Sequence, residues 1–202
     1  MDPSHLLLPA SAAGALRLPS GEEHRRMRLA LDDAALELMT DLRRVPPITV
    51  RADTSIEVAL QGMALSGVRF LFVVDAAQAL AGSVSAHDIQ GEKPLLYLQS
   101  VDGTLASRTH REIEVQHVME PVAEWMVLPL PRVTRLQVRH VAAIFEETRR
   151  RHLVVVDPAR EARGAEVCGL FSATQLEREL GIALSDTPRA ERFVDIQQAL
   201  GH

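Results

Sequence analysis

The stretches that decide the fold are RFLFVVD at residues 69–75 and RHLVVVD at residues 151–157, which lie 82 positions apart. Each is a continuous apolar run rich in β-forming residues, which is typical of a strand buried on both faces. A second run that begins with glycine follows each of them, GSVS at 82–85 and GLFS at 169–172. This repeated order indicates an internal duplication.

Two more pairs of segments extend the repeat toward the N-terminus. LMTD at 38–41 returns as VMEP at 118–121, and ITV at 48–50 returns as LPL at 128–130. The spacing between the copies grows along the chain because the second copy has a longer turn at 158–166. Insertions that fall in turns, while the apolar strands stay aligned, are what a structural duplication predicts.

Each copy also carries a helix between its first and second strands. In the first copy Ser55 offers an N-cap to an apolar periodic run that Gly67 ends, and Ser85 opens another helix. Each half then reads β-α-β-β-α, so we expect an α/β (α+β) fold of two such motifs in a pseudo-two-fold arrangement. Because about 60 residues make a marginal folding unit, the two halves should pack on each other.

The segments outside the strands complete the predicted organisation. A helical period of apolar residues predicts a helix that begins at Glu22 and ends near Arg44, just before Pro46. We expect an N-terminal arm with the start of this helix, a first motif, a connector, a second motif and a C-terminal tail with a short helix, at residues 1–35, 36–95, 96–116, 117–183 and 184–202.

The composition disfavours several classes of protein. A net charge of −5, a pI near 5.9 and an aromatic content of 3% argue against binding to nucleic acid or to an anionic membrane surface. The single cysteine, Cys168, cannot form an intramolecular disulfide or a multi-cysteine zinc site, and the histidines lack paired metal spacing. No apolar stretch reaches the ~18 residues that cross a bilayer, and the N-terminus lacks a signal-peptide pattern. We expect a cytoplasmic protein without a metal site.

The repeats resemble the tandem cystathionine-β-synthase (CBS) domain family in its stand-alone bacterial type. The resemblance covers roughly residues 36–180 and is carried by Gly82, Ser85 and Asp88, which match the family's pattern of glycine, two residues, serine or threonine, two residues and aspartate. In the second copy Gln175 takes the place of the aspartate. The resemblance implies two motifs that face each other across a cleft, an adenosine ligand in that cleft (AMP, ADP, ATP or S-adenosylmethionine), and a homodimer.

The residue chemistry at the first motif suits such a ligand. Asp88 can accept both ribose hydroxyls, Ser85 and the helix start behind it can meet a phosphate, and Arg69 can reach phosphates with its planar guanidinium. The strand edge at residues 48–50 can form an apolar wall for the base. The ligand-binding residues expected at this first site are Asp88, Ser85, His87, Arg69, Ile48, Val50 and Val84.

The second motif is expected to form a weaker site, from Ser172, Thr174, Gln175, Arg151, Leu128 and Leu130. Helix capping is the alternative at both copies, because each serine and the residue three positions later fit a capping box that needs no ligand. At the second motif capping is the favoured interpretation, since glutamine stands where the family has aspartate. We therefore expect two unequal sites, with the first dominant.

The sequence contains no phosphate-binding glycine loop of the P-loop type, no nucleophile elbow and no zinc-protease helix motif, which disfavours an enzyme. The expected function is a regulatory module that senses an adenosine-containing ligand and signals to an unidentified protein partner or through its oligomeric state, with no required cofactor. The alternative is a CBS pair that binds no ligand and serves as a dimerisation or interaction scaffold.

Overall fold

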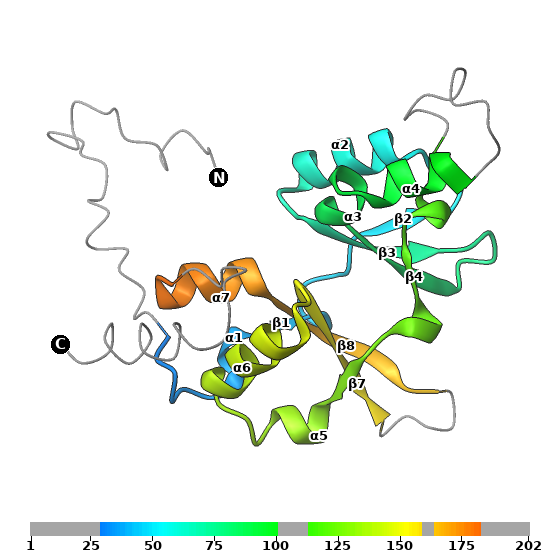
Figure 1. The fold of residues 1–202 in the computed structure, drawn as a ribbon. Helices are drawn as coiled ribbons and strands as arrows, with labels where there is room; N and C mark the ends of the chain where they lie inside the picture. Colours follow the sequence, from blue (N-terminus) through cyan, green and yellow to red (C-terminus); the bar gives the residue numbers. More distant parts are fainter. Residues whose placement is uncertain (1–28, 101–112, 159–163, 183–202) are drawn as a thin grey trace, which may run out of the picture.

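The computed structural model describes residues 29–100, 113–158 and 164–182, which form two sheets flanked by helices (Figure 1). The elements of the first half are β2 (Thr49–Arg51), α2 (Ile56–Ser66), β3 (Phe70–Val74), β4 (Leu80–Ser85), α3 (Ala86–Gln90) and α4 (Lys93–Ser100). The second half has η4 (Val115–His117), η5 (Val122–Glu124), β6 (Val127–Pro129), α5 (Leu130–Val133), α6 (Val138–Thr148), β7 (His152–Asp157), β8 (Glu166–Ser172) and α7 (Ala173–Leu180). The predicted α+β fold with a duplicated β-α-β-β-α motif is confirmed.

Local sequence signals explain how each half is built. Ser55 caps α2 by accepting a hydrogen bond from the backbone N–H of Val58 at 3.3 Å, and Gly67 ends the helix with a φ of 67°. Because α2 returns the chain to the same edge, β2 and β3 pair in parallel, whereas β3 and β4 form an antiparallel hairpin. Strands β6, β7 and β8 repeat this pairing.

The helix predicted from Glu22 to near Arg44 is wrong over its described part. Residues 29–44 contain only a one-turn helix, α1 (Ala35–Leu38), and a short strand, β1 (Thr40–Asp41); residues 22–28 lie outside the described residues, as do the arm at 1–20 and the tail helix. The apolar spacing in this segment reflects burial in the core of the second half, where Ala35 and Leu38 are fully buried, and not a long helix.

Each half lends a short strand to the sheet of the other. Strand β1 pairs antiparallel with β8, and its equivalent β5 (Glu120–Pro121) pairs antiparallel with β4. The sheet orders are therefore β1-β8-β7-β6 and β2-β3-β4-β5. A side chain on Gly82 would collide with the backbone of Glu120, and one on Gly169 with the Met39 side chain. The repeated glycines thus allow the exchanged strands to approach.

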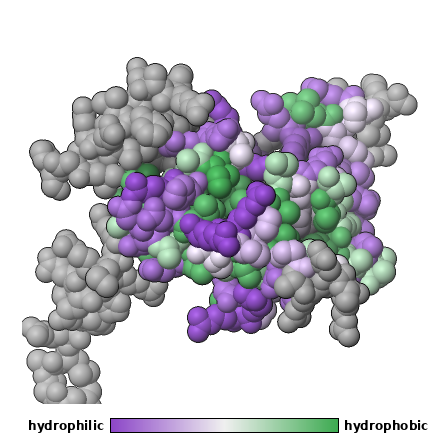
Figure 2. All heavy atoms as spheres, turned by 90° about the horizontal axis from the view of Figure 1, so that it is seen from below, coloured by the Kyte–Doolittle hydropathy of each residue, from purple (hydrophilic) through white to green (hydrophobic). Residues whose placement is uncertain are grey.

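The two hydrophobic cores are also built across the halves. Ile113 and Val118, which lie before β5, are buried in the first core, just as Ala35 and Leu38, which lie before β1, are buried in the second. The halves therefore pack on each other, as predicted, and Cys168 is a buried member of the second core. At the surface, Figure 2 shows hydrophobic residues gathered in the middle of the face seen from below, between hydrophilic ones.

None of the helices in residues 29–100, 113–158 and 164–182 is long and apolar enough to cross a membrane. In the same ranges, no group of histidine, cysteine, aspartate and glutamate side chains is arranged to hold a metal ion.

Candidate functional site

A cleft lies between the two halves, where β3 and β7 begin and β4 ends. It is lined by residues of both halves: Phe70, Ser83, Ser85, His87, Asp88, Glu120, Trp125, Met126, Arg149, Arg150, Arg151, His152 and Val154. Three residues of the predicted first site, Ser85, His87 and Asp88, therefore share one cleft with Arg151, which was predicted for the second site. The structure brings together residues that the sequence assigned to separate sites.

The cleft lies on the pseudo-two-fold axis of the repeat. Phe70 and His152 hold equivalent positions in β3 and β7, and their ring centroids are 4.6 Å apart. The backbone hydrogen bonds next to these two residues are also equivalent. The carbonyl of Arg69 accepts a hydrogen bond from the N–H of Ala86, and that of Arg151 accepts one from the N–H of Ala173, both at 2.9 Å. Burial, together with the charge of Arg151, lowers the pKa of His152 to about 4 against the opposing effect of Asp88. His152 is therefore neutral at physiological pH.

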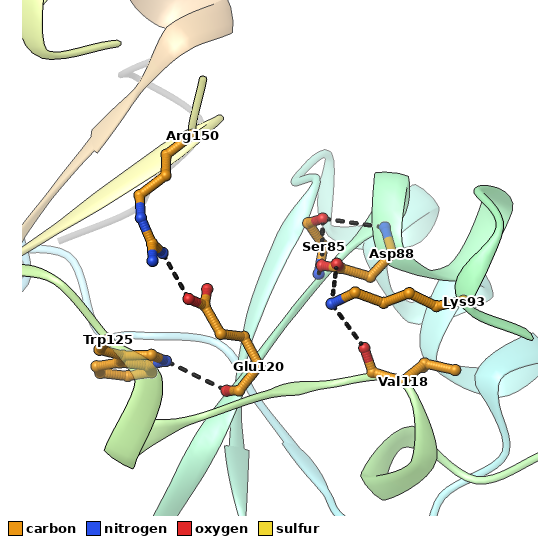
Figure 3. Close-up of polar contacts among 7 residues, drawn as sticks. All are labelled: Ser85, Asp88, Lys93, Val118, Glu120, Trp125 and Arg150. Carbon is orange, nitrogen blue, oxygen red and sulfur yellow. Dashed lines mark hydrogen bonds and ion pairs between the residues drawn. The ribbon is translucent and has the colours of Figure 1, made fainter. Parts of the chain in front are cut away.

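The Asp88 carboxylate is held by two neighbours (Figure 3). Its Oδ2 accepts hydrogen bonds from the backbone N–H of Ser85 at 2.8 Å and from the Ser85 hydroxyl at 2.5 Å, while the Ser85 Oγ accepts the Asp88 N–H at 3.2 Å. Its Oδ1 lies 2.6 Å from Nζ of Lys93. The predicted capping box is thus present at the first motif.

These contacts leave Asp88 ionised with limited room for a ligand. Burial alone would raise the pKa of Asp88, but the hydrogen bonds from Lys93 and Ser85 outweigh it and hold the pKa below its usual value. A carboxylate offers about four acceptor positions, and Ser85 and Lys93 fill three of them. By this count the described residues leave one acceptor position, on Oδ1, for a ribose hydroxyl.

Lys93 and Ser83 are among the residues around the first motif that the sequence reasoning missed. Lys93 not only pairs with Asp88 but also donates to the carbonyl of Val118 at 3.2 Å, which ties α4 to the segment before β5. The sequence feature that could have pointed to Lys93 is its positive charge five positions after Asp88, the aspartate of the motif. Ser83 lines the cleft because alternate residues of β4 point to opposite faces of the sheet. By the same alternation Val84 is fully buried in the first core and has no surface on the cleft.

The other residues predicted for the first site lie outside the cleft lining. Arg69 is exposed just before β3. Ile48 is 38% exposed beside β2, whereas Val50, within β2, is half-buried against the first core. The edge formed by these two residues is present as predicted, but it does not line the cleft that holds Ser85 and Asp88.

The side chains of the second motif have different hydrogen-bond partners from those of the first. Ser172 precedes α7 without any side-chain capping hydrogen bond, so the capping-box interpretation is wrong at this copy. Gln175 is longer than aspartate, and its Oε1 instead accepts a hydrogen bond from the Thr40 hydroxyl of the exchanged strand β1 at 3.4 Å. Arg151 is tied to α7, since it donates to the Glu177 carboxylate at 3.4 Å and to Thr174 at 3.3 Å. Leu128 and Leu130 are partly buried against the second core.

An ion pair crosses the cleft from the sheet of the first half, which includes the exchanged strand β5, to the second half (Figure 3). Nη1 of Arg150, between α6 and β7, lies 2.5 Å from Oε1 of Glu120 in β5. The same glutamate accepts a hydrogen bond through its backbone carbonyl from Nε1 of Trp125 at 3.2 Å, and the Trp125 ring lies 6.1 Å from that of Phe72. Aromatic and cationic side chains therefore both line the cleft.

The comparisons with known proteins agree with this fold. Residues 34–92 match the family model of the CBS domain. No curated protein matches the sequence. An uncharacterized conserved protein from Pyrococcus horikoshii has a similar structure, with 16% identity and a TM-score of 0.51 over 79% of this chain and 100% of that one. An identity this low shows a shared fold and nothing finer.

Two further solved structures are similar at lower TM-scores. CBSX2 of Arabidopsis thaliana, solved in complex with AMP, has 22% identity and a TM-score of 0.46 over 72% of this chain and 94% of that one. The CBS domain pair of MJ0100, in complex with 5′-methylthioadenosine and S-adenosylmethionine, has 19% identity and a TM-score of 0.46, covering 72% of this chain and 97% of its own.

The family match spans the elements from α1 to α3, and the second half repeats their order and pairing. Residues 34–92 therefore belong to the CBS domain family, and the two halves together fold as a tandem CBS-domain protein.

Proposed function

We propose that the cleft binds an adenosine-containing ligand and that the protein is a regulatory module without catalytic activity of its own. The observation that carries the proposal is the position of Ser85 and Asp88, the motif residues of the CBS family, opposite three consecutive arginines of the other half. An ionised carboxylate with an open acceptor position suits a ribose hydroxyl, and guanidinium groups suit phosphates. The rings of Phe70 and Trp125 offer flat apolar surface to a base.

The candidate ligands are AMP, ADP, ATP and S-adenosylmethionine, and this class comes from the family resemblance. Because both halves line the cleft, a bound ligand would stabilise one arrangement of the halves over another. The Arg150–Glu120 ion pair joins the second half to the sheet of the first through β5, and the Phe70–His152 contact joins the halves directly, so both would change with that arrangement. The resulting signal would pass to a protein partner or to the oligomeric state, which we expect to be a homodimer in the cytoplasm.

The scaffold hypothesis also has an observation in its favour. Asp88 already has partners in Ser85 and Lys93, so this half of the motif is stable without a ligand. A CBS pair of this kind would act only through its surfaces.

Thermal unfolding separates the two proposals. A ligand that binds only the folded protein raises its midpoint in proportion to the logarithm of ligand concentration, and 100 times the Kd adds about 2.7 kcal/mol. We expect at least one of adenosine, AMP, ADP, ATP and S-adenosylmethionine to give such a rise. A flat response to all five at millimolar concentration contradicts ligand binding and favours the scaffold.

A further inference from the structure

Arg149 has a backbone conformation that side chains other than glycine rarely adopt. It ends helix α6 with a φ of 54°, in the left-handed region. Gly67 occupies the equivalent place at the end of α2, with a φ of 67°. The left-handed region disfavours residues with a Cβ because this atom crowds the backbone, so an arginine at this position is less stable than a glycine. Strain of this kind persists mostly where a side chain has a function.

The three arginines that line the cleft differ in their partners. Arg151 is bound to Glu177 and Thr174, and Arg150 is bound to Glu120. The guanidinium of Arg149 has no hydrogen-bond or ion-pair partner anywhere in residues 29–100, 113–158 and 164–182, although it lines the same cleft. A phosphate that bound Arg150 or Arg151 would have to compete with a carboxylate, whereas Arg149 offers all of its donors.

We infer that Arg149 is the residue that binds the phosphate of the ligand, and that the ligand is an adenosine nucleotide rather than adenosine or a cationic adenosyl compound. This inference rests on the proposed function and moves the phosphate role that the sequence suggested for Arg69 to a residue that lines the cleft. Its planar guanidinium can donate two parallel hydrogen bonds to one phosphate. The repeat places glycine at the same position in the first half, so the second half supplies this cation and the first half supplies Asp88.

The inference predicts opposite effects of one substitution on stability and on binding. Arg149→Gly relieves the backbone strain, so the midpoint of thermal unfolding without ligand should rise by about 2–4 °C. The same change removes the phosphate donor, so the Kd for AMP and ATP should rise by about three- to ten-fold. The Kd for adenosine should stay within about two-fold. A residue with only a structural role would not produce this combination.

Trp125 provides the readout, because it is the single tryptophan of the sequence and it lines the cleft. Fluorescence titrations with adenosine, AMP and ATP are compared for the wild type, Arg149→Gly, Arg149→Lys and Arg132→Ala. Arg149→Lys keeps a cation and should retain part of the phosphate affinity. Arg132 is exposed in α5 and does not line the cleft, so Arg132→Ala controls for the loss of one positive charge.

The outcomes separate this inference from the proposed function. Equal losses for adenosine and for the nucleotides in Arg149→Gly, or nucleotide affinities that do not change, overturn the role of Arg149 and leave the adenosine cleft standing. If no adenosine compound changes the Trp125 fluorescence or the thermal midpoint of any of these proteins, the proposed function fails and this inference fails with it.

Discussion

Phe70 and His152 occupy the same position in the two repeats and contact each other, with ring centroids 4.6 Å apart. A residue that touches its own counterpart lies on the axis that relates the two halves. The two rings differ in their chemistry, because the imidazole of His152 can take up a proton and the phenyl ring of Phe70 cannot. The packing of the two halves is therefore coupled to the protonation of His152.

This coupling predicts a pH dependence of stability. The pKa of His152 is lowered from 6.5 to about 4, chiefly by burial, so between these two pH values the unfolded chain binds more protons than the folded protein. The contribution of neutral His152 is complete above pH 6.5 and is lost as the pH falls toward 4. The slope from this residue is at most about 1.4 kcal/mol in the free energy of unfolding per pH unit.

His152→Phe tests this prediction, because it copies the residue of the first repeat. Urea unfolding at several pH values between 7 and 4.5 should show a shallower pH dependence in the variant than in the wild type. Identical slopes would mean that other groups cause the acid sensitivity.

The exchanged strands predict an order of effects among glycine substitutions. Gly82→Ala places a Cβ against the backbone carbonyl of Glu120, which cannot move without disturbing β5, and should lower the free energy of unfolding by about 1–3 kcal/mol. Gly169→Ala meets the Met39 side chain, which can rotate, and should lower it less. The control is Gly62→Ala in α2, where no atom lies within 4 Å and a gain of about 0.5–1 kcal/mol is expected. Chemical denaturation measures all three, and a smaller loss for Gly82→Ala than for Gly169→Ala would contradict the close approach of the Glu120 backbone to Gly82.

The ion pair between Glu120 and Arg150 should couple the second half to the sheet of the first half, because Glu120 lies in the exchanged strand β5. In a double-mutant cycle of Glu120→Gln and Arg150→Gln, we expect a coupling energy of about 0.5–1 kcal/mol, because both side chains are partly exposed at about 30%. Addition of 1 M NaCl should reduce this coupling, since the Debye length then falls to about 3 Å. Additive single substitutions at low salt would show that the pair does not hold the halves together.

The elements that the sequence predicted correctly are those whose signal is local. Strands β3 and β7 were identifiable because a strand buried on both faces is apolar along its whole length, and the ends of α2 were marked by Ser55 and Gly67. The segment before β2 was mistaken for a helix because its partner, β8, lies far along the chain. Its buried residues Ala35 and Leu38 lie in the one-turn helix α1, after which the chain enters the exchanged strand β1 instead of continuing as a helix.

The full lining of the cleft could not be predicted from the sequence, because it forms only when strands from distant parts of the chain pair. Ser85, His87, Asp88 and Arg151 were identified from the motif and the repeat, yet their convergence on one cleft required the fold. The capping box formed at Asp88 and failed at Ser172, because Gln175 binds Thr40 of the exchanged strand instead. The difference between Arg149, Arg150 and Arg151 arises from which carboxylates the fold places beside each of them.

Calorimetric titration of AMP into matched variants tests whether the first motif provides the dominant adenosine site. Asp88→Asn keeps a side chain that can cap α3 but removes the charge, and Gln175→Ala removes the equivalent side chain of the second motif. We expect Asp88→Asn to weaken AMP binding by about ten-fold or more, as is typical of a lost hydrogen bond to a charged group, and Gln175→Ala to leave the Kd within about two-fold. Loss of binding in Gln175→Ala with unchanged binding in Asp88→Asn would contradict the account.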